Sequence, residues 1–193
     1  YASGEQEASV IALMIRRRLD DGEDPSRFAI LYRNNAQSRA FEEAFIRRRI
    51  PHIVVGGTGF YARKEVKDVL AYLRVIANPR SLADFERIVT VPPRKIGATT
   101  VTRLREAAAK AGVSGAEVLD IDPAILTSVG IKGAAQKRLS DLGALLRGFR
   151  LQSATEPASD VAQEVIESVK YLAYLDKDDP ARAEDRRANV EEL

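Results

Sequence analysis

The sequence predicts an α/β fold that continues into an all-α segment. Two short apolar runs rich in β-forming residues, residues 28–33 and 52–55, each precede a stretch with helical periodicity. From residue 78 onward the apolar spacing is helical. The order strand, helix, strand, helix indicates a parallel βαβ unit. Because two strands do not make a stable parallel sheet, we expect the remaining strands of that sheet to lie outside this sequence.

The elements follow one another in a clear order. A first helix over residues 5–20 ends in an acidic turn, and the first strand leads into a second helix that Pro51 stops. The second strand is followed by a glycine loop and then by a third helix. The helices expected after the first are 37–49, 63–77, 81–89, 99–111, a short one at 115–119, 134–151, 156–174 and 182–193.

Composition excludes several kinds of site. The 193 residues include no Cys and one His, His52, which excludes disulfides and thiolate sites and argues against a His-based metal site or a Ser-His-Asp triad. No metal site is therefore predicted. The apolar runs are too short for a membrane span, and the N-terminus lacks a signal-peptide pattern. We expect a cytoplasmic protein with no membrane partner.

The positive charge is concentrated in the middle of the chain. Net charge is only +2, but residues 27–110 hold 17 Lys and Arg against 7 Asp and Glu, a net of +10. Such a segment can follow a phosphate backbone, and solvated helix faces are the alternative.

The most informative position is the end of the first predicted strand, where Tyr32 and Arg33 stand side by side. Ligand sites of α/β folds lie at the carboxyl ends of strands. A ring that stacks on a purine and a cation for the far phosphate suit a nucleoside triphosphate. A structural salt bridge is the alternative for Arg33. The sequence contains neither G-x-x-x-x-G-K-[ST] nor an apolar strand ending in Asp-Glu, so we expect no ATP hydrolysis by this chain alone. Arg33 would then act in trans to a P-loop carried elsewhere, as an arginine finger does.

Three glycine-containing loops are further candidates. Residues 57–62 match G-x-G-x-x-A, but no acidic residue follows at the end of a next strand, which favours a simple turn over a dinucleotide site. The loops at Gly97 and at residues 130–133 place glycine between two helices with cations close by. Such turns can present N–H groups to a DNA phosphate, and a purely structural turn is the alternative.

Several strings, taken together and in order, resemble the UvrD/Rep/PcrA-type superfamily 1 DNA helicases. These strings are residues 30–39, 56–57 with 60–74, 76–79, 85–88, 92–97 and 187–193. The resemblance implies a fragment of an ATP-dependent helicase that moves 3′ to 5′ on DNA. Residues 1–126 would be the first segment of domain 2A, with a partial RecA-like parallel sheet, and residues 127–193 the beginning of helical domain 2B. It also implies ATP and Mg²⁺, bound mainly by a domain 1A absent from this sequence. The implied partners are DNA, as single strand and duplex junction, and the remaining helicase domains.

The resemblance also assigns roles to individual positions. Tyr32 would stack on adenine, Arg33 would reach the γ-phosphate as the catalytic residue, and Gln37 belongs to the same nucleotide motif. The positions expected to meet nucleic acid are Phe60, Arg63, Lys64, Lys67, Arg94, Lys95, Gly97 and Lys132. Lys95 departs from the family, which usually has Gly there. The helicase part of an ATP-dependent recombination nuclease and a non-enzymatic DNA-binding or partner-docking module are the alternatives.

Overall fold

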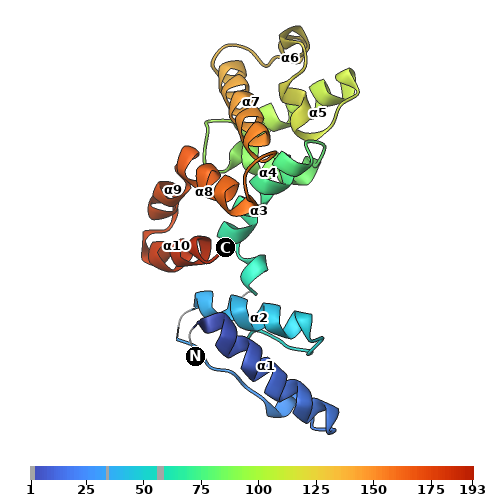
Figure 1. Ribbon diagram of the computed structural model, residues 1–193. Helices are drawn as coiled ribbons and strands as arrows, with labels where there is room; N and C mark the ends of the chain where they lie inside the picture. The colour runs from blue at the N-terminus through green and yellow to red at the C-terminus, as the bar shows by residue number, and fades with distance from the viewer. Residues whose placement is uncertain (1–2, 34, 56–58) are drawn as a thin grey trace. The chain divides into compact units, whose positions relative to one another are not determined.

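The chain divides into two compact units, which we describe separately. In this computed structural model, residues 3–33, 35–55 and 59–193 are described. Unit 1 comprises Tyr1–Lys67 and Asp179–Leu193, and unit 2 comprises Asp68–Asp178. Figure 1 shows the order of the helices along the chain. The predicted division at residues 126 and 127 stays a prediction.

Unit 1 is built on two packed helices, α1 (Gly4–Asp20) and α2 (Ser38–Arg47), which lie side by side in Figure 1. The Ser3 hydroxyl accepts the Gln6 N–H at 3.2 Å and so caps α1. Buried Ala8, Ala12 and Ala44 let the two helix backbones approach closely. The other elements of unit 1 are the 3₁₀ turns η1 (Pro25–Arg27), η2 (Asn35–Gln37), η3 (Phe60–Ala62) and η5 (Pro180–Arg182), the first turn of α3 (Lys64–Ala77), and α10 (Ala183–Glu191).

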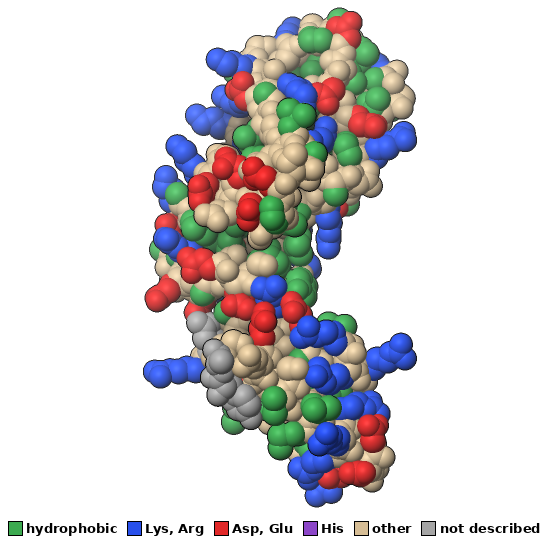
Figure 2. Space-filling view, in the orientation of Figure 1, with side chains coloured by type: hydrophobic (Ala, Val, Ile, Leu, Met, Phe, Trp, Pro, Cys, Tyr) green, Lys and Arg blue, Asp and Glu red, His purple; other side chains and the backbone are tan. Residues whose placement is uncertain are grey.

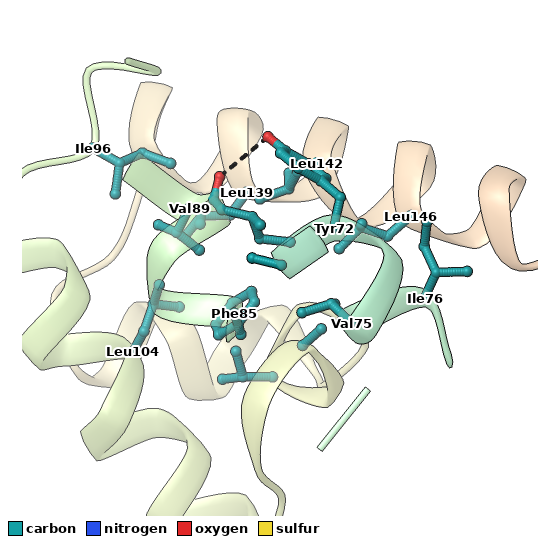
Figure 3. Packing of buried hydrophobic residues seen from close by; sticks show 14 of the residues in the cluster. Tyr72, Val75, Ile76, Phe85, Val89, Ile96, Leu104, Leu139, Leu142 and Leu146 are labelled. Atoms are coloured by element: carbon teal, nitrogen blue, oxygen red, sulfur yellow. Dashed lines mark hydrogen bonds between the residues drawn. The ribbon is translucent and has the colours of Figure 1, made fainter. Parts of the chain in front are cut away.

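Unit 2 is a helical body with a large apolar core. Its elements are the rest of α3, then α4 (Leu82–Thr90), α5 (Ala98–Ala111), η4 (Gly115–Leu119), α6 (Pro123–Ser128), α7 (Ala134–Gln152), α8 (Ala158–Ser168) and α9 (Tyr171–Asp178). Figure 3 shows side chains of α3, α4 and α7 packed together, among them Tyr72, Phe85 and Leu139. The 3₁₀ turn η4 requires glycine at its first residue, because a Cβ on Gly115 would lie 2.3 Å from the Pro79 carbonyl oxygen.

The predicted two-stranded parallel sheet is wrong, because no strand occurs among the described residues. Residues 28–33 and 52–55 have neither helix nor strand structure. Three of their apolar side chains are exposed, Leu31 by 96%, Ile53 by 85% and Val55 by 83%, while Phe28, Ile30 and Val54 are half-buried. A strand exists only when a neighbouring strand pairs with its backbone N–H and C=O groups, and neither segment finds one. The described fold is therefore helical.

The expected helices are present with some differences. The single helix predicted over residues 156–174 is divided into α8 and α9, because Lys170 adopts a left-handed backbone with φ of 55°. Helix α6 was not predicted; Asp122 caps it by accepting the Ala124 N–H at 2.8 Å, with Pro123 as its first residue. Within the described residues, no helix combines the length and apolar character that crossing a membrane requires.

Candidate functional site

Tyr32 and Arg33 stand just before η2, and Gln37 holds their backbone in place. The Gln37 Oε1 atom accepts the Arg33 backbone N–H at 3.2 Å, which ties the end of the predicted strand to the start of α2. The Arg33 side chain is exposed, and Tyr32 is half-buried. The Arg33 guanidinium forms no ion pair with any residue that the structure describes, so the salt-bridge alternative has no support there. The neighbouring Asn34 lies outside the described residues.

Two adjacent carboxylates on α2 fix the segment that follows Gly59. Glu42 accepts the Phe60 backbone N–H at 2.9 Å and 3.1 Å through its two oxygens. Glu43 accepts the Tyr61 hydroxyl at 2.6 Å and the Arg39 Nε–H at 2.9 Å. The Tyr61 hydroxyl, assisted by Arg39 and opposed by partial burial, lowers the pKa of Glu43 below its ordinary value. Burial, with the nearby Glu43 carboxylate, raises the pKa of Tyr61. Sequence analysis missed this pair of carboxylates, since nothing local links α2 to residues 60 and 61.

Phe60 and Arg63, both predicted to contact DNA, are buried. Two guanidinium groups contact the Phe60 ring, with the Cζ atoms of Arg39 and Arg63 lying 5.6 Å and 5.3 Å from its centroid. Arg63 donates to the Ser38 hydroxyl at 2.9 Å and to the Asn189 amide oxygen at 2.6 Å. These contacts give both side chains a packing role, while their contact with DNA stays a prediction. The other two cations of the block, Lys64 and Lys67, are exposed.

Asn189 links two segments that are far apart in the sequence, α10 and the start of α3. Its side-chain amide donates to Glu65 Oε1 at 2.7 Å and accepts from Arg63, so α10 is fastened to the start of α3. The Glu65 carboxylate also lies 3.5 Å from Arg186 Nε, and all of these side chains are buried. A buried charged network of this kind is stable only when its members are hydrogen-bonded. Sequence analysis did not single out Asn189, although it belongs to the last of the resembling strings.

Arg94 is half-buried, and its guanidinium is hydrogen-bonded within unit 2. Its guanidinium donates to the carbonyl oxygens of Ile88, Val91 and Pro92 at 2.6–3.2 Å and to the Tyr72 hydroxyl. The peptide bond between Val91 and Pro92 is cis. Arg94 therefore holds the connector between α4 and α5 in shape, and its predicted contact with DNA stays a prediction.

The next residues of that connector face outward. Lys95 is exposed, adopts a left-handed backbone with φ of 56°, and has no ion-pair partner in the part of the chain that is described. Ile96 is buried and anchors the loop. Gly97 precedes α5 as its N-cap without a side-chain cap, and a Cβ added there would meet nothing within 4 Å. The N–H groups of the first turn of α5 and the Lys95 ammonium are thus presented by one short loop.

The turn between α6 and α7 has a similar design. Gly130 and Gly133 both have positive φ, 79° and 60°, while Ile131 between them is buried. Arg103 from α5 donates to the Gly130 carbonyl oxygen at 3.0 Å and braces the turn. Lys132 is exposed and makes no ion pair with a described residue. Sequence analysis did not name Arg103; its place in the basic segment was the only signal.

Basic side chains also gather over α1 and α2 of unit 1, as Figure 2 shows. Two of them are paired on the surface, Arg16 with Asp20 and Arg18 with Glu23 at 2.6 Å. Exposed pairs of this kind contribute little to stability. The choice between solvated faces and a phosphate-binding surface therefore stays open for unit 1.

Comparison with known proteins decides the family. Residues 2–127 match the model of the UvrD-like helicase C-terminal domain. The chain belongs to the UvrD-like helicase family. This confirms the resemblance drawn from the motifs.

Similar UvrD-like relatives are ATP-dependent DNA helicases named PcrA. The protein of Leuconostoc citreum is 39% identical over 172 residues, covering 87% of this chain and 22% of the relative. That of Staphylococcus epidermidis is 32% identical over 187 residues, covering 97% and 25%, and that of Bacillus subtilis is 32% identical over 178 residues, covering 92% and 23%. The chain thus spans about a quarter of the length of these curated relatives.

Proposed function

We propose that this chain is part of an ATP-dependent helicase that moves 3′ to 5′ along DNA and separates the duplex. Within that enzyme it supplies Tyr32, which stacks on adenine, and Arg33, which reaches the γ-phosphate. The observation that carries the proposal is the exposed Arg33 guanidinium, which has no partner among the described residues, with its backbone held by Gln37 in a UvrD-like chain.

The chemistry of Arg33 suits a phosphate bound by another part of the enzyme. A guanidinium is always charged, and its planar fork matches two phosphate oxygens. In P-loop enzymes Mg²⁺ is held by the P-loop and a nearby acidic strand, so the P-loop part of the parent would hold it here. ATP would supply the transferable phosphoryl group, and Mg²⁺ would neutralise charge on its phosphates. Arg33 then stabilises the charge that develops on that group, and hydrolysis releases the contact.

The DNA-binding part of the proposal rests on exposed cations, of which Lys95 and Lys132 form no ion pair with a described residue. Lys95 with Gly97, and Lys132 in the α6–α7 turn, each combine an ammonium with the start of a helix. Lys64 and Lys67 add exposed charge at the start of α3. Contacts of this kind bind phosphates without reading sequence, and their affinity falls steeply with salt.

An unwinding assay on the full-length parent tests this function. Duplexes with a 3′ tail, a 5′ tail or no tail are incubated with enzyme and ATP. We expect unwinding of the 3′-tailed duplex, none without ATP, and loss of unwinding in Arg33→Ala with retained single-strand binding. Preference for a 5′ tail, or full unwinding by Arg33→Ala, would contradict the proposal.

A further inference from the structure

A groove in unit 2 lies between the segment leading into α6 and the first turns of α7. Its volume is about 360 Å³. Leu119, Ile121 and Pro123 form one wall, and the buried Leu126 and Leu139 form the floor. This size lies at the lower end of the range of roughly 300–1,000 Å³ in which proteins bind small ligands. A groove of this size accommodates a few side chains of a bound segment and is too small for the surface of a folded protein.

The opposite wall is polar and comes from one stripe of α7. Gly133, Gln136, Lys137 and Ser140 follow the spacing i, i+3, i+4, i+7, which places them on one face of the helix. Lys137 and Ser140 are exposed and have no side-chain partner in the described chain. The Gln136 amide reaches across to the Pro123 carbonyl oxygen at 3.3 Å and so links the two walls.

The lining of the groove carries a single charged side chain, the cation Lys137, while the exposed Asp141 follows Ser140 outside the lining. None of its lining residues is acidic. The two carboxylates that precede α6 are engaged: Asp120 pairs with Arg147, and Asp122 caps α6 through the Ala124 N–H at 2.8 Å. Lys137 is therefore a cation beside an apolar wall with no carboxylate in its lining.

We propose that this groove binds a short peptide segment of a partner protein, one in which an apolar side chain stands next to a carboxylate. The apolar side chain would pack against Leu119 and Ile121, and the carboxylate would pair with Lys137. A DNA strand fits less well, because an apolar wall cannot satisfy phosphate or sugar oxygens. The inference does not rest on the proposed helicase activity, since Tyr32 and Arg33 belong to unit 1.

Nuclear magnetic resonance on the ¹⁵N-labelled 193-residue chain tests the inference. The probe is acetyl-Gly-Leu-Glu-Leu-Glu-Gly-amide, and the matched control peptide carries Gln in place of both Glu. We expect saturable shifts at Leu119, Ile121 and Lys137, and binding of the control peptide that is weaker by about threefold or more, because exposed charge pairs contribute modestly.

Three variants separate groove binding from general attraction. Lys137→Glu should weaken binding of the acidic peptide by about threefold or more. Lys177→Glu, which changes an exposed lysine on α9, should leave it unchanged. Ser140→Tyr should abolish binding by filling the groove from an exposed position, without disturbing the core. The proposal would be overturned if the peptide caused no saturable chemical-shift changes, or if both peptides bound equally well. It would also be overturned if duplex DNA changed the chemical shifts of the groove residues and the peptide did not. Self-association of the chain through this groove would overturn it too.

Discussion

Replacing Lys95 with glycine is expected to stabilise unit 2 and to weaken the proposed binding of DNA at this loop. Lys95 has φ of 56°, a region that costs a residue with a Cβ roughly 1–2 kcal/mol. Glycine removes that cost but has more freedom in the unfolded chain, which returns about 0.4–1 kcal/mol. Because Lys95 is exposed and has no partner among the described residues, no other contact is lost. The balance lies between no change and a gain of about 1.6 kcal/mol in the free energy of unfolding, with a midpoint of about 0.8 kcal/mol.

The control variant is Lys95→Ala, which removes the charge and keeps the left-handed strain. Urea denaturation should show that Lys95→Gly is more stable than the unmutated chain. The free energy of unfolding of Lys95→Ala should lie within about 0.5 kcal/mol of that of the unmutated chain. Fluorescence anisotropy with labelled duplex at several salt concentrations should show the same loss for both variants. If Lys95 contacts one phosphate, the slope of log K against log salt falls in magnitude by about 0.9. A destabilised Lys95→Gly would refute the strain argument, and an unchanged slope would refute the phosphate contact.

Two further predictions concern unit 1. Asn189→Ala removes hydrogen bonds to two buried charged side chains, Arg63 and Glu65. We therefore expect urea denaturation to show a loss of about 2–4 kcal/mol in the free energy of unfolding. A loss below about 1 kcal/mol would show that these hydrogen bonds do not stabilise unit 1. Tyr61→Phe removes the strongest influence that lowers the pKa of Glu43. A lowered folded-state pKa gives stability that is present above the ordinary pKa of Glu43 and is lost as pH falls through the folded value. Tyr61→Phe should therefore be less stable at pH 7, and the difference should shrink on acidification; a constant difference would contradict this.

Helices were predictable from this sequence because their signal is local. Apolar residues at helical spacing fix the buried face of a helix such as α7, and Gly112, with φ of 68°, ends α5 where expected. The sheet prediction failed for the opposite reason. An apolar run such as residues 52–55 indicates an extended segment. Such a segment becomes a strand only when the backbone of a second segment forms hydrogen bonds with it, and the run itself does not show whether that second segment is present. In the described chain Ile53 and Val55 are exposed.

The candidate site was predictable in its motif but not in its contacts. The adjacency of Tyr32 and Arg33 is visible in the sequence, whereas the burial of Arg63 depends on Asn189, which follows 126 residues later. Similarly, nothing in the sequence shows that Arg94 donates to three backbone carbonyl oxygens. Burial and long-range hydrogen bonds are tertiary properties, and for charged residues they decide between packing and recognition.

Steady-state ATP hydrolysis by Arg33 variants of the full-length parent tests the central claim most directly. Arg33→Ala should lower kcat by about 10³ to 10⁵ with little change in KM for ATP, because a finger acts on the transition state. Arg33→Lys should not restore the rate, since a point ammonium does not copy the planar fork. Tyr32→Ala, as the matched control, should raise KM for ATP more than it lowers kcat, because stacking is equal in ground and transition states. A near-normal kcat with a raised KM in Arg33→Ala would contradict the account and leave Arg33 as a ground-state ligand.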